Sequence, residues 1–277
     1  MQKDLRVLIT GAASGLGKAL ALAYAEKGGR IALVDVNEAR GRETLAAVQT
    51  LGAQGFFHQA DVRSSDCFEQ LLAEVTQRWG GLDVLINNAG VAAHGAIDEA
   101  PIVDWQWILD INLMAVVRAC RTFVPLFKAQ GHGTIINIAS MAGLLHSADM
   151  GSYSVSKAGV VALSETLYAE LRMLGIKVSV VCPGFFQTNL IESLRSPDPA
   201  AESLVKKLLT LSRIDADDIA AIIVRKAAAG TFMILPHAIY RPLWLLKRWF
   251  PSLYLFILIR LAGSIKKQRA PAQKILA

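Results

Sequence analysis

Two patterns of apolar residues alternate along most of the chain. Short continuous apolar runs are followed by longer segments in which apolar residues recur every three or four positions. A short apolar run is typical of a strand that is buried on both faces, and the longer period is typical of a helix. We therefore expect helices between strands at residues 6–9, 31–34, 55–58, 84–87, 134–139, 177–181 and 231–235.

Strands that alternate with helices predict a parallel sheet covered on both faces, with right-handed crossovers. We expect one doubly wound α/β domain of the Rossmann type, with a seven-stranded sheet, over residues 1–235. A helical extension is expected over residues 236–277. Ligands of such sheets bind beyond the carboxyl ends of the strands.

A glycine-rich turn follows the first strand. Gly11, Gly15 and Gly17 stand where the strand must turn into a helix, so the backbone can approach a pyrophosphate at the helix N-terminus. The second strand ends in Asp35, which suits hydrogen bonds to the ribose hydroxyls of an adenosine. Its charge would repel a 2′-phosphate and favours NAD over NADP. Arg40 and Arg42 are close enough in sequence that NADP remains an alternative cofactor. The alternative role for Asp35 is that of a solvated turn residue.

Tyr153 and Lys157 stand four positions apart in a segment with helical periodicity. Side chains at this spacing are neighbours on a helix, and a nearby cation favours the phenolate. The pair is a candidate general acid/base. Tyrosine and lysine also occur at this spacing on ordinary helix surfaces, so the other motifs of the chain must decide whether this pair is catalytic.

Several motifs in order resemble the short-chain dehydrogenase/reductase family over residues 5–235. They are TGxxxGxG at 10–17, Asp61 with Val62, NNAG at 87–90, the set Asn112, Ser140, Tyr153 and Lys157, and CPGFFQT at 182–188. The C-terminal tail and the PGFF segment are similar to those of retinol and hydroxysteroid dehydrogenases.

The resemblance implies the roles of the four catalytic residues. Tyr153 would protonate the substrate oxygen in reduction and deprotonate it in oxidation. Lys157 would lower the pKa of Tyr153 and bind the nicotinamide ribose, while Ser140 would orient the substrate oxygen. Asn112 would hold a water in the proton relay, although a helix-interior asparagine more often bonds its own backbone.

The resemblance also implies the cofactor contacts. Asp61 would contact the adenine, and Thr188 the nicotinamide carboxamide. The full expected set is Gly11, Ser14, Gly15, Leu16, Gly17, Asp35, Asp61, Val62, Asn88, Ala89, Gly90, Tyr153, Lys157, Pro183, Gly184 and Thr188.

Other polar and apolar residues near the motifs have weaker support. His94 and His146 are expected to be exposed loop residues rather than members of the cleft, and we predict no metal site. Met141, Phe185 and Phe186 suit either an apolar substrate wall or core packing.

Composition separates the C-terminal segment from the rest of the chain. Residues 236–277 hold eight Lys or Arg and no acid. Because the net charge of the whole chain is +6, the remainder carries a net charge of −2. Nothing in that remainder predicts a nucleic-acid partner. The cysteines at 67, 120 and 182 are few and dispersed, which indicates a reducing, cytoplasmic compartment. Only Met1 to Asp4 precede the first strand, so we expect no secretory signal.

The apolar run Leu253–Ile259 is too short to span a bilayer. With Trp and Lys/Arg at its margins, it suits a helix lying in a membrane interface. Packing against the core or a second subunit is an equal alternative, and a substrate lid is compatible with both. The apolar share of 53% is high for a soluble protein and is consistent with surface that is not all in water.

We therefore expect an NAD-preferring alcohol dehydrogenase or carbonyl reductase that acts on a hydrophobic, lipid-like alcohol, ketone or aldehyde. We also expect a homo-oligomer, in the cytoplasm or peripheral to a membrane. The alternative is a catalytically idle dinucleotide-binding sensor or scaffold at a membrane surface. The complete set of Asn112, Ser140, Tyr153 and Lys157 argues against that alternative.

Overall fold

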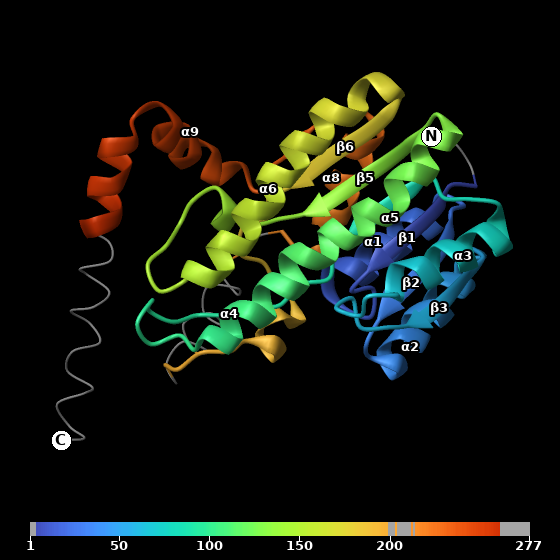
Figure 1. The fold of residues 1–277 in the computed structure, drawn as a ribbon, viewed down its shortest axis with the longest axis horizontal. Helices are drawn as coiled ribbons and strands as arrows, with labels where there is room; N and C mark the ends of the chain where they lie inside the picture. The colour runs from blue at the N-terminus through green and yellow to red at the C-terminus, as the bar shows by residue number, and fades with distance from the viewer. Residues whose placement is uncertain (1–3, 199–202, 204–211, 213, 261–277) are drawn as a thin grey trace.

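The protein is built around a seven-stranded parallel sheet with helices on both faces (Figure 1). The computed structural model describes residues 4–198, 203, 212 and 214–260. The strand order is β3-β2-β1-β4-β5-β6-β7, so the chain winds outward in one direction and then in the other. The predicted doubly wound fold is confirmed.

The strands lie close to the predicted ranges. Their bounds are β1 Arg6–Thr10, β2 Arg30–Asp35, β3 Gly55–Gln59, β4 Val84–Asn87, β5 Gly133–Ile138, β6 Ile176–Val181 and β7 Met233–Ile234. The last strand is shorter than the predicted 231–235, because only Met233 and Ile234 pair with β6.

The helices fill the predicted intervals. Those of the domain are α1 Gly15–Ala25, α2 Glu38–Thr50, α3 Cys67–Trp79, α4 Ile102–Leu109, α5 Ala115–Gln130, α6 Gly151–Leu171 and α8 Ala216–Ala228. Short turns of 3-10 helix occur at η2 Met141–Gly143, η3 Arg172–Leu174, η4 Asn189–Ser193 and η5 Ala238–Tyr240. Between α4 and α5 the chain makes a π-helical turn, η1 Asp110–Met114, which the periodicity did not predict.

The core has two layers because successive strand residues point to opposite faces of the sheet. Leu8 and Val34 pack with residues of α3, α5 and α6. Ile9 and Leu33 pack with residues of α1, α2 and α8 on the other face. The continuous apolar runs of the sequence are thus strands buried on both sides.

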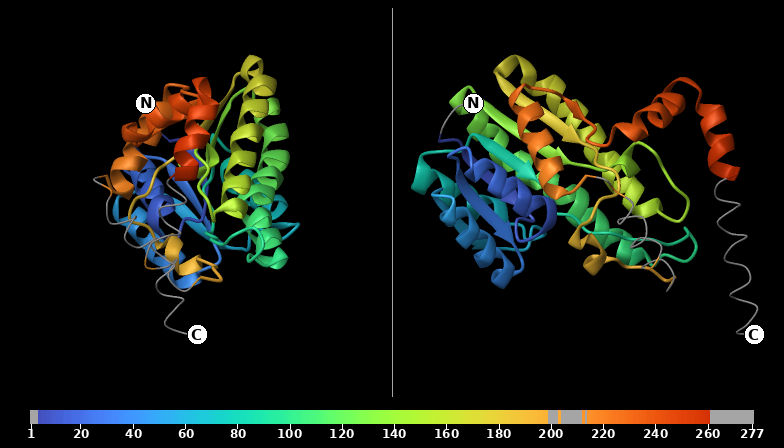
Figure 2. Two further views of the ribbon diagram at one scale, coloured as in Figure 1. Left: turned by 90° about the vertical axis from the view of Figure 1, so that its left-hand side faces the viewer. Right: turned by 180° about the vertical axis from the view of Figure 1, so that it is seen from behind.

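The C-terminal segment leaves the domain as α9, Arg241–Trp249, followed by a further helix over residues 251–260. These two helices project from one end of the molecule (Figure 1, Figure 2). No helix among the described residues has the length and apolar character that a membrane span requires.

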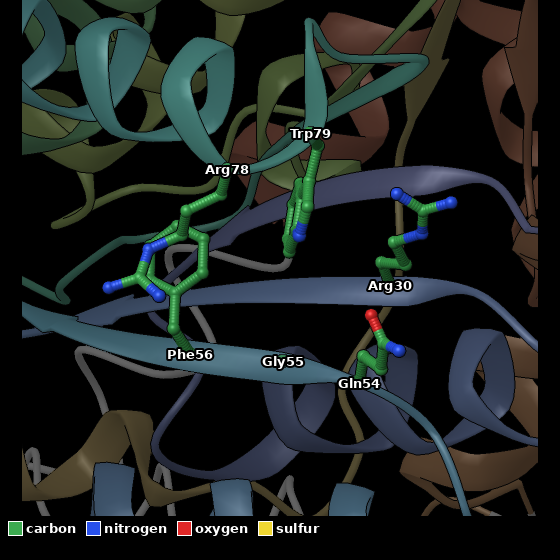
Figure 3. Close-up of a pocket in the computed structure, with 6 residues that line it drawn as sticks. All are labelled: Arg30, Gln54, Gly55, Phe56, Arg78 and Trp79. Atoms are coloured by element: carbon green, nitrogen blue, oxygen red, sulfur yellow. The ribbon is translucent and has the colours of Figure 1, made fainter.

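A hollow of about 270 Å³ lies at the β3 edge of the sheet, between Arg30, Gln54, Gly55, Phe56, Arg78 and Trp79 (Figure 3). Arg30 begins β2 and Gly55 begins β3, so the hollow is at the amino ends of these strands. Ligands of a doubly wound sheet bind at the opposite, carboxyl ends. The hollow is therefore not part of the site described next.

Candidate active site

The glycine-rich turn is tightly packed. Gly11 has a φ of +65°, and a Cβ on Gly17 would lie 2.0 Å from the carbonyl oxygen of Gly11. The turn therefore excludes side chains at these positions. Ser14 caps α1 by position, but its side chain makes no capping hydrogen bond. The first amides of α1, which include those of Gly15 and Leu16, lie at the end of the helix that attracts an anion.

Asp35 lies at the carboxyl end of β2, beside the glycine-rich turn. Its carboxylate accepts the backbone N–H groups of Ala13 and Asn37, each at 3.0 Å. The first bond ties the end of β2 to the loop that follows β1. An acid held here suits the ribose hydroxyls that lie beside the pyrophosphate in doubly wound folds.

The end of β4 is tied to the same turn by a residue that the expected set omits, Thr10. Its hydroxyl accepts the N–H groups of Asn88 at 3.0 Å and Ala89 at 3.1 Å. The Asn88 amide in turn donates to the carbonyl oxygens of Thr10 and Gly11. Asn88 and Ala89 thus fix the shape of the turn. Thr10 heads the glycine motif, but spacing alone did not reveal this contact.

Asn112 lies in the π-helical turn and is fully buried. Its side chain exchanges hydrogen bonds of 2.8 and 3.0 Å with the backbone of Val91, and it donates to the hydroxyl of Ser156 at 3.1 Å. The ordinary expectation that a helix asparagine bonds its own backbone is wrong here. Asn112 instead joins the loop after β4 to α6.

Ser140, Tyr153 and Lys157 come together at the carboxyl end of β5. The Ser140 hydroxyl hydrogen-bonds with the phenol of Tyr153. The Nζ atom of Lys157 donates to the carbonyl oxygen of Ile138 at 3.0 Å and lies 6.0 Å from the centre of the Tyr153 ring. The expected neighbours on α6 are thus adjacent, and the serine of another element completes the group.

Close packing sets the position of Ser140 against α6. A Cβ on Gly143 would lie 2.7 Å from the backbone of Lys157, so this glycine lets η2 approach the helix. A Cβ on Gly90 would meet both the Lys157 Nζ and the Asn112 Oδ1 at 3.3 Å. Gly90 therefore lies between the lysine and the asparagine.

Burial governs the ionisation of this group. It raises the pKa of the Tyr153 phenol, which the hydrogen bond with Ser140 partly offsets. It lowers the pKa of Lys157 to about 8. We expected Lys157 to lower the pKa of Tyr153, but the net direction is upward, because burial of the phenol is the larger effect. The Lys157 ammonium itself is directed at the Ile138 carbonyl.

The segment after β6 returns over the glycine-rich turn. The amide of Met141 donates to the carbonyl oxygen of Pro183 at 2.8 Å, which joins this segment to η2. Thr188 caps η4 through a 2.8 Å bond from Leu190, and its Cβ is 3.8 Å from where a Cβ on Gly15 would stand. The structure therefore brings Thr188 beside Gly15 of the glycine-rich turn.

The C-terminal segment contacts Gly184 directly. His237 accepts the N–H of Gly184 at 3.1 Å, and a Cβ on Gly184 would lie 2.1 Å from the Tyr240 ring. Only glycine leaves room for that ring. Neither His237 nor Tyr240 was among the expected site residues, because the sequence pattern does not relate them to Gly184.

Several other expectations concerned individual side chains. Asp61 lies just beyond the end of β3 and pairs with Arg63 at 2.6 Å, while Val62 is buried in the core. His94 is 8% exposed, so the expectation that it is an exposed loop residue is wrong; its backbone pairs with that of Arg195. His146 is exposed, as expected.

The three candidates for an apolar substrate wall differ in burial. Met141 and Phe186 belong to the two core layers, and Phe185 is partly buried. Core packing therefore accounts for Met141 and Phe186. A different apolar group surrounds Tyr153, which packs with Val91, Ala93, Trp107, Ile108, Ala142 and Met150.

Comparison with known proteins decides the family. The family model described as short chain dehydrogenase matches residues 6–199, well over half of the chain. The chain belongs to the short-chain dehydrogenase/reductase family. Its members are oxidoreductases that use NAD(P), so the protein is an NAD(P)-dependent dehydrogenase or reductase.

Similar proteins include a CLA biosynthesis dehydrogenase/reductase of Lactiplantibacillus plantarum, 33% identical over 87% of this chain and 91% of the relative. A 3beta-hydroxysteroid dehydrogenase of Mediterraneibacter gnavus is 35% identical over 67% of both chains. A short-chain dehydrogenase/reductase of Burkholderia phymatum, solved in complex with NAD, has a TM-score of 0.86 at 31% identity. It covers 91% of this chain and 96% of its own.

Proposed function

We propose that the protein is an NAD-preferring alcohol dehydrogenase or carbonyl reductase that acts on a hydrophobic, lipid-like substrate. The observation that carries the proposal is the meeting of the Ser140 and Tyr153 hydroxyls beside Lys157, at the carboxyl end of the sheet. When bound, the nicotinamide accepts or supplies a hydride at the substrate carbon. The chain's own residues must then manage one proton at the substrate oxygen.

Tyr153 is the residue that we assign to this proton. A carbonyl oxygen that gains a hydride becomes an alkoxide, and the neutral phenol is the proton donor. The raised pKa keeps Tyr153 protonated at neutral pH, which suits reduction. Oxidation needs the phenolate, so it is expected to be favoured at higher pH. Ser140 would hold the substrate oxygen within reach of the phenol.

Lys157 and Asn112 support this arrangement. Lys157 would bind the nicotinamide ribose, a role supported by the place of its ammonium beside Gly90 at the end of β4. Asn112 fixes the loop of Val91, which forms part of the apolar group around Tyr153. For Asn112 we therefore propose a positioning role, together with the expected water of the proton relay.

The apolar group around Tyr153 supports a hydrophobic substrate. The side chains packed around Tyr153 are apolar, and Trp107 and Met150 are only partly buried. Transfer of apolar area from water to such a wall contributes about 25 cal/mol per Å². The similar 3beta-hydroxysteroid dehydrogenase is named for a substrate of this class.

The glycine-rich turn and Asp35 support NAD as the cofactor. A Cβ on Gly17 would meet the Gly11 carbonyl, which is the tight turn expected before a pyrophosphate-binding helix N-terminus. The Asp35 carboxylate suits ribose hydroxyls rather than a 2′-phosphate. The remaining expected contacts, Asp61 with the adenine and Thr188 with the carboxamide, are part of the same proposal.

We also propose that residues 236–260 bring the enzyme to an anionic lipid surface. Large apolar side chains are exposed on both C-terminal helices, among them Trp249 at 71% and Ile259 at 70%. The segment 236–277 is basic and free of acids. Apolar side chains with flanking cations are typical of interfacial helices, and each cation contributes about 1 kcal/mol near an anionic surface.

Replacement of Tyr153 by Phe tests the enzymatic proposal. Turnover with graded long-chain alcohols and ketones should fall by about two to four orders of magnitude, because the proton donor is lost while the ring remains. NADH binding, measured by fluorescence titration, should change little.

Tyr168→Phe is the matched control, because Tyr168 lies on the same helix and its ring packs on Phe232, 4.7 Å away. It should retain full turnover. Turnover of Tyr153→Phe within a few-fold of the parent would exclude Tyr153 as the proton donor. Absence of turnover in the parent, with intact NADH binding, would favour the sensor or scaffold alternative.

A further inference from the structure

An ion pair joins two distant parts of the chain at the edge of the cofactor site. The Arg40 guanidinium binds the Glu192 carboxylate through both branches, with distances of 2.7 Å for Nη1–Oε2 and 3.3 Å for Nη2–Oε1. Arg40 is in the first turn of α2, and Glu192 is in η4. Such bidentate geometry engages two of the five N–H donors of the guanidinium, in the paired arrangement that can also bind a phosphate.

The position of the pair relates it to the adenosine end of the site. Arg40 follows Asp35 by one short turn, and its backbone amide donates to Asn37, the cap of α2. Glu192 follows Thr188, which stands over the glycine-rich turn. The segment after β6 therefore crosses the path expected for the pyrophosphate and ends on α2.

Other contacts hold Glu192 in this place. The Ser193 hydroxyl accepts the Ala92 amide at 3.4 Å, and the backbones of Arg195 and Ala92 are bonded at 3.2 Å. Arg195 also pairs with Asp104 at 2.8 Å and lies over the Trp107 ring. The loop after β4 thus anchors the segment on the side away from α2.

Stability is not the main effect of this pair. The side chains of Arg40 and Glu192 are 42% and 50% exposed, and an exposed ion pair shifts an equilibrium by about five-fold or less. Its consequence for recognition is different. Arg40 is the cation beside Asp35 that a 2′-phosphate would need, and Glu192 competes for the same donors.

We propose that Glu192 is a cofactor-specificity residue, which disfavours NADP by holding the guanidinium of Arg40. The inference rests on the proposed preference for NAD and adds a second determinant to Asp35. Asp35 repels the 2′-phosphate, and Glu192 removes the counter-charge that would offset this repulsion. Glu192 is a positioning residue, because it acts through Arg40.

The test is Glu192→Gln, with NADPH and NADH binding measured by fluorescence titration at low salt. NADPH affinity should rise about five-fold, and NADH affinity should change less than two-fold, since only the 2′-phosphate meets the released guanidinium. The gain should vanish in the double variant Arg40→Gln/Glu192→Gln. It should also shrink as salt screens the new pair.

Glu38→Gln is the matched control. Glu38 is on α2, is 49% exposed and pairs with Arg42 at 2.7 Å, so this change removes the same charge and releases a different arginine of the helix that carries Arg40. It should leave the ratio of NADPH to NADH affinity unchanged.

Three results would overturn the assignment. These are no gain in Glu192→Gln, a gain that persists without Arg40, or an equal gain in Glu38→Gln. If the parent binds the two dinucleotides equally, the preference for NAD itself is wrong. If the parent prefers NADH and Glu192→Gln leaves the ratio unchanged, only the role of Glu192 is wrong.

Discussion

The buried ammonium of Lys157 makes a direct prediction about stability. The side chain is 5% exposed, and its Nζ has a hydrogen bond to the Ile138 carbonyl. Burial lowers its pKa from 10.5 to about 8, because the charged form loses its hydration. We predict that, above about pH 8, the free energy of unfolding of the protein without cofactor rises with pH relative to that of Lys157→Met.

The sign follows from proton binding in the two states. Between pH 8 and 10.5 the unfolded lysine holds its proton and the folded one releases it, so the unfolded state binds more protons. The contribution of Lys157 to stability therefore increases with pH in this window. The buried thiols of Cys67, Cys120 and Cys182 have raised pKa values and act in the opposite direction, but the parent and Lys157→Met share them. Below pH 8 both forms are charged, and the full cost of the buried ammonium is present. The pKa difference corresponds to about 3 kcal/mol, of which about 2 kcal/mol is regained by pH 9.5.

Urea unfolding at pH 7, 8, 9 and 9.5 measures this effect. Lys157→Met also leaves the Ile138 carbonyl without its partner, but that loss does not vary with pH, so the difference between the two profiles isolates the titration. Tyr153 contributes little below pH 9.5, because its raised folded pKa affects stability only once the unfolded phenol ionises near 10. Lys128→Met, which removes an exposed cation, is the control. Parallel profiles for the parent and Lys157→Met would refute the reasoning.

Two further predictions concern the cofactor and the lipid surface. The parent is expected to prefer NAD over NADP by about ten-fold or more in kcat/KM. Asp35→Asn keeps an acceptor for the Ala13 amide but removes the charge, so this preference should narrow. An unchanged ratio would show that the charge of Asp35 does not act on the cofactor. Trp249→Ser should weaken co-sedimentation with phosphatidylserine vesicles, whereas Met173→Ser, at an apolar side chain 90% exposed on the domain, should not. Parent protein that stays in the supernatant at low salt would contradict the lipid proposal.

The sequence predicted the sheet because strands buried on both faces leave continuous apolar runs. The ends of β1 and β3 differ from the prediction by one residue, since a strand end depends on pairing rather than on burial. Tyr153 and Lys157 were placed on one helix because their spacing is local. Ser140 was placed beside them only through the family resemblance.

Contacts between distant loops were beyond the sequence. The pair of Arg40 and Glu192 joins residues 152 positions apart, and no periodicity relates them. The burial of His94 depends on the backbone of Arg195, which folds over it from another loop. The partners of Asn112 depend on the π-helical turn. Such a turn adds one residue to the α-helical repeat, and the pattern of apolar residues does not reveal it.

The C-terminal segment supports both loops that flank the proposed reacting groups. His237 and Tyr240 hold Gly184 in the loop after β6. Lys247 donates to the carbonyl oxygen of Leu144 at 2.6 Å, and the buried Tyr254 bonds the backbone of His146, so the loop after η2 is held as well. Truncation after residue 236 would remove these supports together with any lipid contact, and a loss of activity would then have two causes. Substitutions confined to exposed residues such as Trp249 leave the supports in place, so they separate lipid binding from the integrity of the site.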